Sequence, residues 1–235
     1  MKTVIDKKKI LRRAQNANTA SVSGLVLLLA GVVLPVIVPK LPPTLSQTLA
    51  LSAILGGMIL SMVGIYFANR WVRKPRPEDV LSKALKGLDD KFIIYHYPSL
   101  PCEHILLTPN GVVVLETVNI GGEFTYKDGR WSERMSIGRA FRSIVEERLG
   151  DPTKSATALK TYIAGKLAEV CGTSIPVQPI IVFTHPAAEL EAAPGPVPVY
   201  TAEKLKKNVS MNSPRLPDET YALLAEFLKK ETSGE

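Results

Sequence analysis

Residues Glu103 to Asn119 read EHILLTPNGVVVLETVN, and this stretch decides the fold of the region around it. Two apolar runs, 104–107 and 112–118, flank a Thr-Pro-Asn-Gly sequence that is typical of a tight turn. The pattern predicts a β-hairpin. Each predicted strand carries one acid in an apolar setting, Glu103 where the first strand begins and Glu116 near the end of the second.

The length of the turn decides how the two acids face each other. A two-residue turn at 109–110 pairs Glu103 directly with Glu116, with Cβ atoms ~5 Å apart. Like charges at that distance repel, and a bound cation or a shared proton relieves them. A three-residue turn with Gly111 in the left-handed conformation shifts the register and directs His104 toward Glu116 instead. In a third interpretation, both acids are strand-end residues that reach solvent.

Outward from the hairpin, hydrophobic periodicity and turn residues predict the remaining elements. The predicted helices cover 78–88, a stretch beginning at Asp151 and Pro152, a stretch beginning at Ala202, and 217–230, with a weaker helical pattern at 137–149. The predicted strands cover 92–97, 123–127, 177–184 and 197–200. This order predicts one mixed α/β domain, a mixed sheet flanked by helices.

Two uncharged apolar stretches, about 20–38 and 48–68, precede this domain. Each has roughly the 20 residues that a helix needs to cross a bilayer, and neither shows the polar stripe of a helix packed on a soluble domain. The sequence therefore predicts a transmembrane hairpin within 20–69. A cleaved signal peptide and a buried pair of core helices are the alternatives, but the first apolar run is not followed by a small-x-small cleavage site.

The net charge of +7 is concentrated around the apolar stretches. Residues 1–19 carry a net charge of +5 and residues 70–76 one of +4, whereas residues 77–235 carry −3. Basic residues are retained on the cytoplasmic side of a membrane. We therefore expect a multi-pass membrane protein with both termini in the cytoplasm: a basic N-terminal segment over 1–19, a basic linker over 70–77 and a cytoplasmic domain over 78–235.

Small residues in the second apolar stretch bear on how the helices associate. Ala53, Gly57 and Ser61 recur at every fourth position, and Gly64 lies close by. That spacing lets two helix backbones approach closely in lipid, although Gly and Ser are also common in such helices. We therefore expect the lipid bilayer as a partner, together with helix–helix association inside it.

The hairpin and its surroundings resemble the nuclease-related domain, NERD. That family's hairpin reads roughly Asp-His, apolar strand, Gly, apolar strand, Glu-x-Lys-Asn, and a Trp follows, as Trp131 does here. Asp151 and Pro152 resemble the family's Asn-Pro before a helix, and 180–183 resembles its later strand, so the similarity extends over about residues 78–208. The resemblance implies a restriction-endonuclease-like fold behind the transmembrane hairpin.

The resemblance also implies a metal site. Glu103 and Glu116 take the places of the family's Asp and Glu, which bind Mg²⁺, and Val118 stands where the family has a Lys. In phosphodiester hydrolysis the ion polarises the phosphate and stabilises the developing charge, and the Lys positions or activates the attacking water. A Val side chain can do neither, so the resemblance implies a degenerate site unless Lys127 or Lys154 reaches the pair.

We therefore expect a membrane-anchored NERD-like domain with a degenerate nuclease site that binds nucleic acid or a protein partner. The alternatives are an active Mg²⁺-dependent nuclease and a non-catalytic structural or assembly module. The negative charge of residues 77–235 argues against non-specific binding of phosphates by the whole domain. Five arginines form either a local basic patch or a solvated surface: Arg130, Arg134, Arg139, Arg142 and Arg148.

Overall fold

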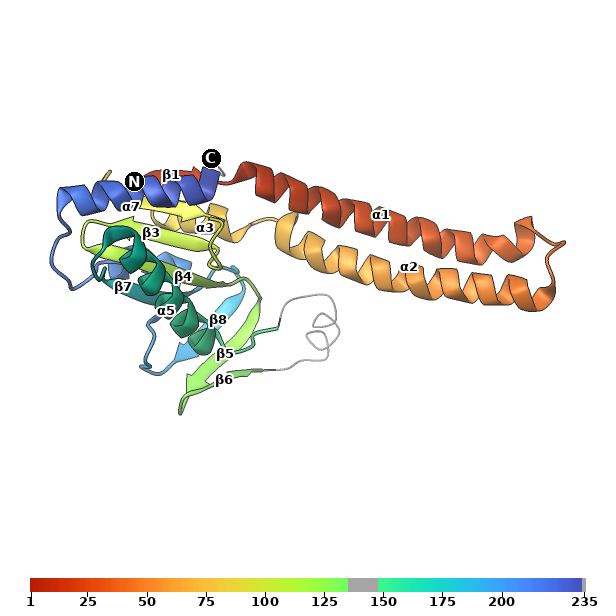
Figure 1. Cartoon of the computed structure of the whole chain (residues 1–235). Coiled ribbons are helices and arrows are strands. Elements are labelled where there is room, and N and C mark those ends of the chain that lie inside the picture. Colours follow the sequence, from red (N-terminus) through yellow and green to blue (C-terminus); the bar gives the residue numbers. More distant parts are fainter. Residues whose placement is uncertain (135–147, 234–235) are drawn as a thin grey trace. The chain divides into compact units, whose positions relative to one another are not determined.

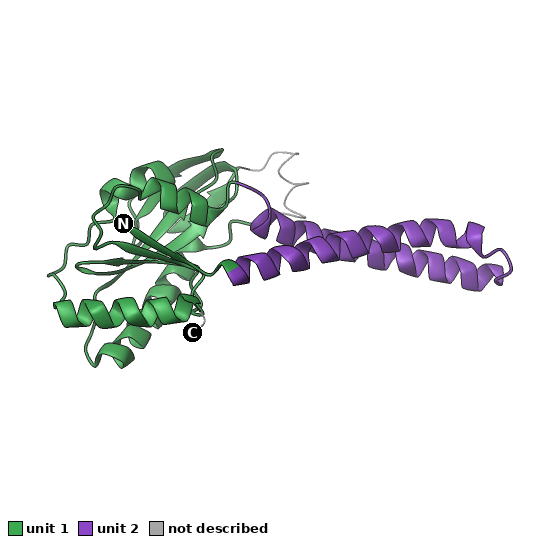
Figure 2. Ribbon diagram, turned by 90° about the horizontal axis from the view of Figure 1, so that it is seen from above, with its two compact units in different colours: residues 1–7, 75–139, 148–235 green, residues 8–74, 140–147 purple. Residues whose placement is uncertain are grey.

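The computed structural model describes residues 1–134 and 148–233. These residues divide into two compact units (Figure 2). Residues 1–7, 75–134 and 148–233 form an α/β unit, and residues 8–74 form a unit of two long helices.

The central sheet of the α/β unit has six strands in the order β1-β2-β3-β4-β7-β9 (Figure 1). The strands are β1 (Lys2–Ile5), β2 (Ile93–His96), β3 (His104–Thr108), β4 (Gly111–Val118), β7 (Val177–Phe183) and β9 (Val199–Thr201). Neighbouring strands are parallel except that β3 is antiparallel to both β2 and β4. All strands but β3 therefore run in one direction, and we call the end of the sheet where they finish the carboxyl edge.

The predicted hairpin is confirmed, with the two-residue turn. His104 pairs with Leu115 and Thr108 pairs with Gly111. The three-residue alternative, which directs His104 toward Glu116, is therefore wrong. When the observed register is continued by one residue beyond β3, Glu103 lies opposite Glu116.

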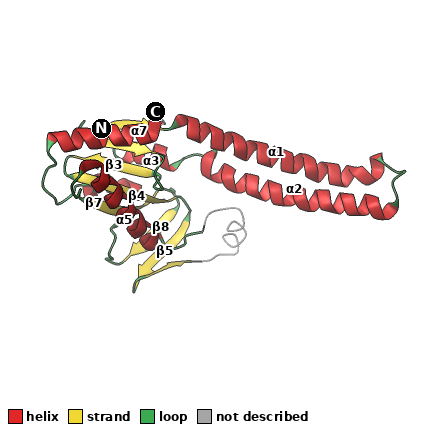
Figure 3. Ribbon diagram, in the orientation of Figure 1, coloured by secondary structure: helices red, strands yellow, loops and turns green. Residues whose placement is uncertain are grey.

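Helices cover both faces of this sheet, as the mixed α/β prediction requires (Figure 3). One face packs against α5 (Pro152–Cys171) and α7 (Asp218–Ser233), and the other against α3 (Pro77–Ala84) and α6 (Ala202–Asn208). Successive strand residues point to opposite faces, so an apolar strand such as β4 fills both cores. We call these the α5–α7 face and the α3–α6 face.

The start of α5 follows the sequence signal that predicts it. The side chain of Asp151 accepts a hydrogen bond from the backbone N–H of Lys154 at 3.0 Å, and Pro152 occupies the first helical position. Gly172, with φ of 66°, ends the helix. Asp at the cap and Pro in the first turn are the residues that favour a helix start.

A second, smaller sheet has the order β6-β5-β8, from β5 (Gly122–Lys127), β6 (Arg130–Glu133) and β8 (Ala188–Ala192). The strand predicted at 123–127 thus exists but lies outside the main sheet. The weak helical pattern at 137–149 falls largely outside the described residues.

The first strand, β1, was not among the strands predicted from the sequence. Lys2 pairs with Ile93 and Ile5 pairs with His96, so residues that precede the first apolar helix form an edge strand of the main sheet. Where the sequence predicts one basic segment over 1–19, the structure has β1 and then the first turns of α1 (Lys7–Ile37). The sheet therefore contains residues from both sides of the two long helices in sequence.

The two long helices, α1 and α2 (Pro43–Trp71), are long and apolar enough to cross a membrane. Only 11% and 17% of their most apolar segments are buried within the structure. The core helix of a soluble protein would be mostly buried. The pair therefore fits a membrane protein. The helices include most of the apolar stretches predicted at 20–38 and 48–68, and α1 begins earlier than the first of them.

Small residues line the contact between α1 and α2. Buried positions recur every seven residues: Ile10, Ala17, Gly24 and Gly31 in α1, and Ala50, Gly57, Gly64 and Trp71 in α2. A seven-residue spacing keeps the same face of each helix toward its partner. A Cβ atom on Gly57 would lie 2.7 Å from the backbone nitrogen of Leu28, so a larger residue would push the helices apart. Among the small residues singled out in the sequence, Gly57, Ser61 and Gly64 thus lie against the neighbouring helix of the same chain.

Candidate functional site

The two predicted acids lie at the carboxyl edge. Glu116 is two residues from the end of β4, Glu103 directly precedes β3, and both are half-buried. Open α/β sheets bind ligands outside the carboxyl ends of their strands, because side chains and loops there are not covered by a further strand. The structure therefore places both acids where a ligand site is expected.

Glu116 lies on the α5–α7 face, because strand residues alternate and Val114 and Val118 of the same strand pack there. Val118 is 8% exposed and belongs to a cluster with Phe124 and Phe183. The position where the resemblance expects a Lys is thus part of the hydrophobic core. It supplies neither charge nor a proton to the site.

Lys127 and Lys154, the two residues considered as replacements, are both exposed. Lys127 ends β5 in the small sheet, and Lys154 lies on the first turn of α5. Their positions therefore give no support to a replacement.

Other polar groups at the carboxyl edge are not among those predicted. The hydroxyl of Thr184, directly after β7, donates to Oδ1 of Asn119 at 3.2 Å, and its backbone N–H donates to the carbonyl of Val118 at 3.0 Å. A Cβ atom on Gly121 would lie 2.7 Å from the ring of His185, so this glycine allows the imidazole to approach the chain. Amide, hydroxyl and imidazole groups thus lie beyond the ends of the neighbouring strands β4 and β7.

Tyr97, directly after β2, adopts a left-handed backbone conformation with φ of 62°. Its backbone N–H donates to the carbonyl of Glu103 at 2.6 Å, which continues the β2–β3 pairing. Regular alternation would place its ring on the same face as the Glu103 side chain. The ring instead contacts His104, with centroids 5.1 Å apart, and the hydroxyl donates to Glu78 at 2.7 Å, both on the α3–α6 face. This conformation is strained for a Tyr, and it removes the ring from the side of Glu103.

Glu78, on the first turn of α3, receives that hydroxyl and is 1% exposed. Its other oxygen forms an ion pair with Nε of Arg76 at 2.9 Å, although the N–H is not aligned as in a good hydrogen bond. Arg76 also reaches the exposed Asp79 at 3.5 Å. A buried carboxylate needs such partners to remain charged. Glu78 is thus a buried acid with two partners, Arg76 and Tyr97.

His96 and His104 lie opposite each other on β2 and β3, and both are fully buried. Their Nδ1 atoms are 2.9 Å apart, and Nε2 of His96 is 2.9 Å from the hydroxyl of Ser82. One Nδ1 must donate and the other accept, so the contact holds a single proton. Burial, and to a lesser extent His104, hold the pKa of His96 well below its usual range, so His96 is neutral at pH 7.

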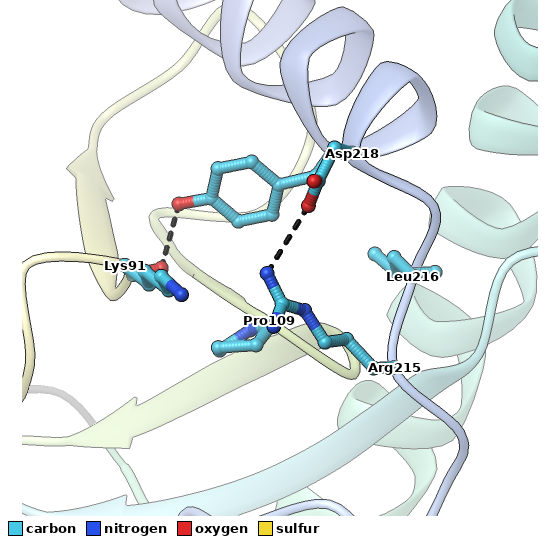
Figure 4. A pocket seen from close by; sticks show the side chains of 6 residues that line it. Lys91, Pro109, Arg215, Leu216 and Asp218 are labelled. Carbon is cyan, nitrogen blue, oxygen red and sulfur yellow. Dashed lines mark hydrogen bonds and ion pairs between the residues drawn. The ribbon is translucent and has the colours of Figure 1, made fainter.

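The opposite end of the sheet has a small hollow beside the β3–β4 turn (Figure 4). It is lined by Lys91, Pro109, Arg215, Leu216, Asp218 and Tyr221. Its polar groups bind one another: the Tyr221 hydroxyl donates to the carbonyl of Lys91 at 2.6 Å, and Arg215 pairs with Asp218 at 3.1 Å. Its volume is about 90 Å³, well below the roughly 300 Å³ from which ligand pockets start. The carboxyl edge remains the better candidate.

The two acids at the carboxyl edge are candidate metal ligands. Within residues 1–134 and 148–233, no three His, Cys, Asp or Glu side chains gather in the manner of a metal site. Mg²⁺, however, is commonly bound through one or two carboxylates, with water completing its shell. Glu103 and Glu116 supply two carboxylates, so the donor set fits a weakly held Mg²⁺ and not an all-protein cage.

The arginines considered as a basic patch are only partly described. Arg134 pairs with Glu123 at 2.8 Å, and that carboxylate raises the pKa of its guanidinium. Arg130 is exposed on β6, whereas Arg139 and Arg142 lie outside the described residues. Among the described arginines, Arg134 thus forms a surface ion pair, and Arg148, like Arg130, is exposed.

Comparison with known proteins identifies the segment that holds these residues. Residues 76–184 match the family model of the nuclease-related domain. The match begins directly before α3 and ends directly after β7, and so spans the hairpin, the small strands β5 and β6, and α5. No curated protein and no solved structure matches the chain.

Proposed function

We propose that this chain, which carries a nuclease-related (NERD) domain at residues 76–184, is a membrane-anchored protein whose nuclease site is degenerate and serves to bind a ligand. The observation that carries the proposal is the burial of Val118 in the core, at the position where the motif has its Lys. The apolar pair α1 and α2 supports the anchor. The basic residues on both flanks of that pair support a cytoplasmic domain and cytoplasmic termini.

Metal binding is the property that this site keeps. Nuclease-like domains of this kind are metal-dependent, and a bound Mg²⁺ supplies polarisation of a phosphate and stabilisation of developing charge. Glu103 and Glu116 would hold the ion and orient it at the carboxyl edge. Val118 cannot hold or move a proton, and a missing group of that kind commonly costs a factor on the order of 10² to 10⁴ in rate.

Nucleic acid is the ligand that follows from such a site. An ion held by the two carboxylates attracts phosphate oxygens, which the domain alone does not attract. The net charge of −3 over residues 77–235 makes the ion, not the protein surface, the source of attraction. Binding of nucleic acid should therefore require the metal. A protein partner remains the alternative ligand for the degenerate site.

The test uses the full chain in detergent, because a truncated domain starting at residue 77 would lack the edge strand β1. Fluorescent single- and double-stranded DNA and RNA are titrated with the protein in EDTA, Mg²⁺ or Mn²⁺, and binding and cleavage are followed together. We expect metal-dependent binding with at most residual cleavage. Glu116→Gln and Glu103→Gln should abolish the metal-dependent part, whereas Glu191→Gln, an exposed acid of β8, should not.

An active nuclease is the second candidate, because the observed register brings both acids to one end of the hairpin. Robust cleavage by the unmodified chain, lost in Glu116→Ala, would establish it and end the degenerate-site proposal. If the site is merely degenerate, Val118→Lys combined with Glu103→Asp should raise metal-dependent cleavage, once folding of this core variant has been checked. If the chain shows neither binding nor cleavage, the result would favour a structural or assembly module.

A further inference from the structure

Basic residues gather at one end of the helical pair. Residues 8–74 contain eight basic residues and no acidic one. Because α1 and α2 are antiparallel, with Gly24 against Ser61 and Gly31 against Ala50, the start of α1 lies beside the end of α2. Seven of the eight basic residues lie at that end, and we call them the basic collar: Lys8, Lys9, Arg12, Arg13, Arg70, Arg73 and Lys74. The eighth, Lys40, lies in the turn at the other end.

A tryptophan lies at the centre of the collar. Trp71 is 2% exposed, and the guanidinium of Arg13 from α1 lies 4.7 Å from its ring centroid. The guanidinium of Arg70 lies 5.8 Å from the same ring. One cation from each helix thus lies against the same indole, and this contact fixes the positions of both guanidinium groups. Arg13 is exposed, so it keeps N–H donors at the surface. Holding like charges together in this way favours a bound anion between or beside them.

The stability of α1 does not explain this arrangement. The positive end of the helix dipole lies at the start of α1, where acids stabilise a helix and cations destabilise it. One acid, Asp6, directly precedes α1, whereas the sequence supplies four cations within the first two turns, Lys8, Lys9, Arg12 and Arg13. The cations outnumber the acid at the end of the helix that disfavours them, so the stability of the helix alone does not account for the collar.

The surface next to the collar identifies the kind of anion. The exposed apolar side chains of α1 and α2, among them Leu25 at 55% and Phe67 at 41%, continue toward the collar. Tyr66 and Phe67 pack edge to face one turn before Trp71, as in the aromatic belt at the border of a bilayer. An anion beside such a surface has to be compatible with lipid. A nucleic acid would place its charged backbone against apolar side chains, which the observations disfavour.

We propose that the basic collar binds the phosphate headgroups of anionic phospholipids, with Arg13 and Arg70 around Trp71 at its centre. This proposal rests on the membrane anchoring within the proposed function. It adds a lipid selectivity that a purely hydrophobic anchor would not have, since apolar helices alone do not distinguish an anionic lipid from a neutral one.

The chain itself supplies the probe. It contains two tryptophans, and Trp131→Phe leaves Trp71 as the only one while keeping an aromatic ring against Phe183. The full chain carrying this change is reconstituted into vesicles of phosphatidylcholine and phosphatidylglycerol, in which one lipid or the other has brominated acyl chains. Bromine quenches indole fluorescence at short range, so the ratio of quenching by the two lipids measures their relative binding near Trp71.

We expect several-fold stronger association of phosphatidylglycerol than of phosphatidylcholine. The ratio of phosphatidylglycerol to phosphatidylcholine quenching should fall toward one in Arg12→Gln and in Arg13→Gln, because each removes a cation near the anionic surface. Lys40→Gln, which removes a cation from the other end of the pair, is the matched control and should leave the preference unchanged.

The remaining outcomes separate this proposal from the proposed function. Equal quenching by both brominated lipids would overturn the collar proposal while leaving the anchor intact. Quenching by neither lipid would overturn the membrane anchor and the collar with it. Two results together would make nucleic acid the ligand of the collar and overturn the lipid assignment. The first is a change of Trp71 emission when a DNA duplex is added to vesicles of phosphatidylcholine alone, and the second is a loss of quenching by brominated phosphatidylglycerol when the duplex is added to the mixed vesicles.

Discussion

At the carboxyl edge, the two faces of one sheet bury their polar side chains to different extents. On the α3–α6 face, Glu78, His96 and Tyr97 are buried, and each is bound to another group of the protein. On the α5–α7 face, Glu103 and Glu116 are half-buried beside the core. Removing one partner of a buried ion pair destabilises the fold, whereas a half-exposed acid is accessible to an ion from solvent. Acids at one end of a nuclease-related sheet therefore need not share one role.

Removing the buried anion should have the largest effect. Glu78→Ala leaves Arg76 and the Tyr97 hydroxyl without their carboxylate, and breaking a buried pair from one side costs about 3 kcal/mol or more. For a unit of this size that lowers the unfolding temperature by roughly 6–12 °C, measurable by near-ultraviolet circular dichroism of the full chain. Asp79→Ala is the matched control, because this exposed acid contacts the same Arg76 at 3.5 Å. It should cost less than about 1 kcal/mol, and equal losses in the two variants would contradict a structural role confined to Glu78.

Tyr97 and Tyr95 allow the hydrogen bonds on the two faces to be compared directly. Tyr97→Phe removes a hydrogen bond to the buried carboxylate of Glu78 and should cost about 2 kcal/mol, since bonds to charged groups are the stronger ones. Tyr95→Phe, on the α5–α7 face, removes only a bond to the neutral carbonyl of Ala225 and should cost about 1 kcal/mol. Both are read from urea unfolding followed by the same signal. A smaller loss for Tyr97→Phe would mean that the strained backbone, not the hydroxyl, holds this ring in place.

Sequence patterns predicted the parts of the fold that rest on local signals. The hairpin follows from apolar runs around Pro109 and Asn110, and α5 follows from Asp151 and Pro152, since turn and cap chemistry act within a few residues. The strand β1 was missed because its four residues pair with a strand some 90 residues away, a contact that periodicity cannot report.

The candidate site was also predicted only in part. Glu103 and Glu116 could be singled out because acids are unusual in apolar strands, and the observed turn decides their register. The left-handed conformation of Tyr97 could not be foreseen, because that conformation is expected of Gly or Asn. The pairing of His96 with His104 depends on the register of β2 against β3, which no turn residue specifies.

Acid should weaken the α3–α6 face through His96. The pKa of His96 in the folded chain lies well below its usual value of about 6.5 in an unfolded chain, so the unfolded chain binds more protons below that pH. Stability is therefore retained above pH 6.5 and falls as the pH decreases, by at most about 1.4 kcal/mol per pH unit. Between pH 7 and pH 5.5 we expect a loss of about 1 kcal/mol from this group. His96→Gln should flatten the dependence in this range, and an unchanged slope would assign the acid sensitivity to other groups.

The smallest effect on the free energy of unfolding is expected at Glu116, which lies on the α5–α7 face. In EDTA, Glu116→Gln should change the free energy of unfolding by no more than about 0.5 kcal/mol, or raise it, because it removes one of two like charges that the register places opposite each other. With Mn²⁺ or Mg²⁺ at ten times the dissociation constant, the unmodified chain should gain about 1.4 kcal/mol, and the variant should gain none. Glu191→Gln, on the exposed face of β8, should keep the full gain. A loss of 2 kcal/mol or more for Glu116→Gln in EDTA would show that this acid, like Glu78, is a structural anion, and the metal site would then have to be sought elsewhere.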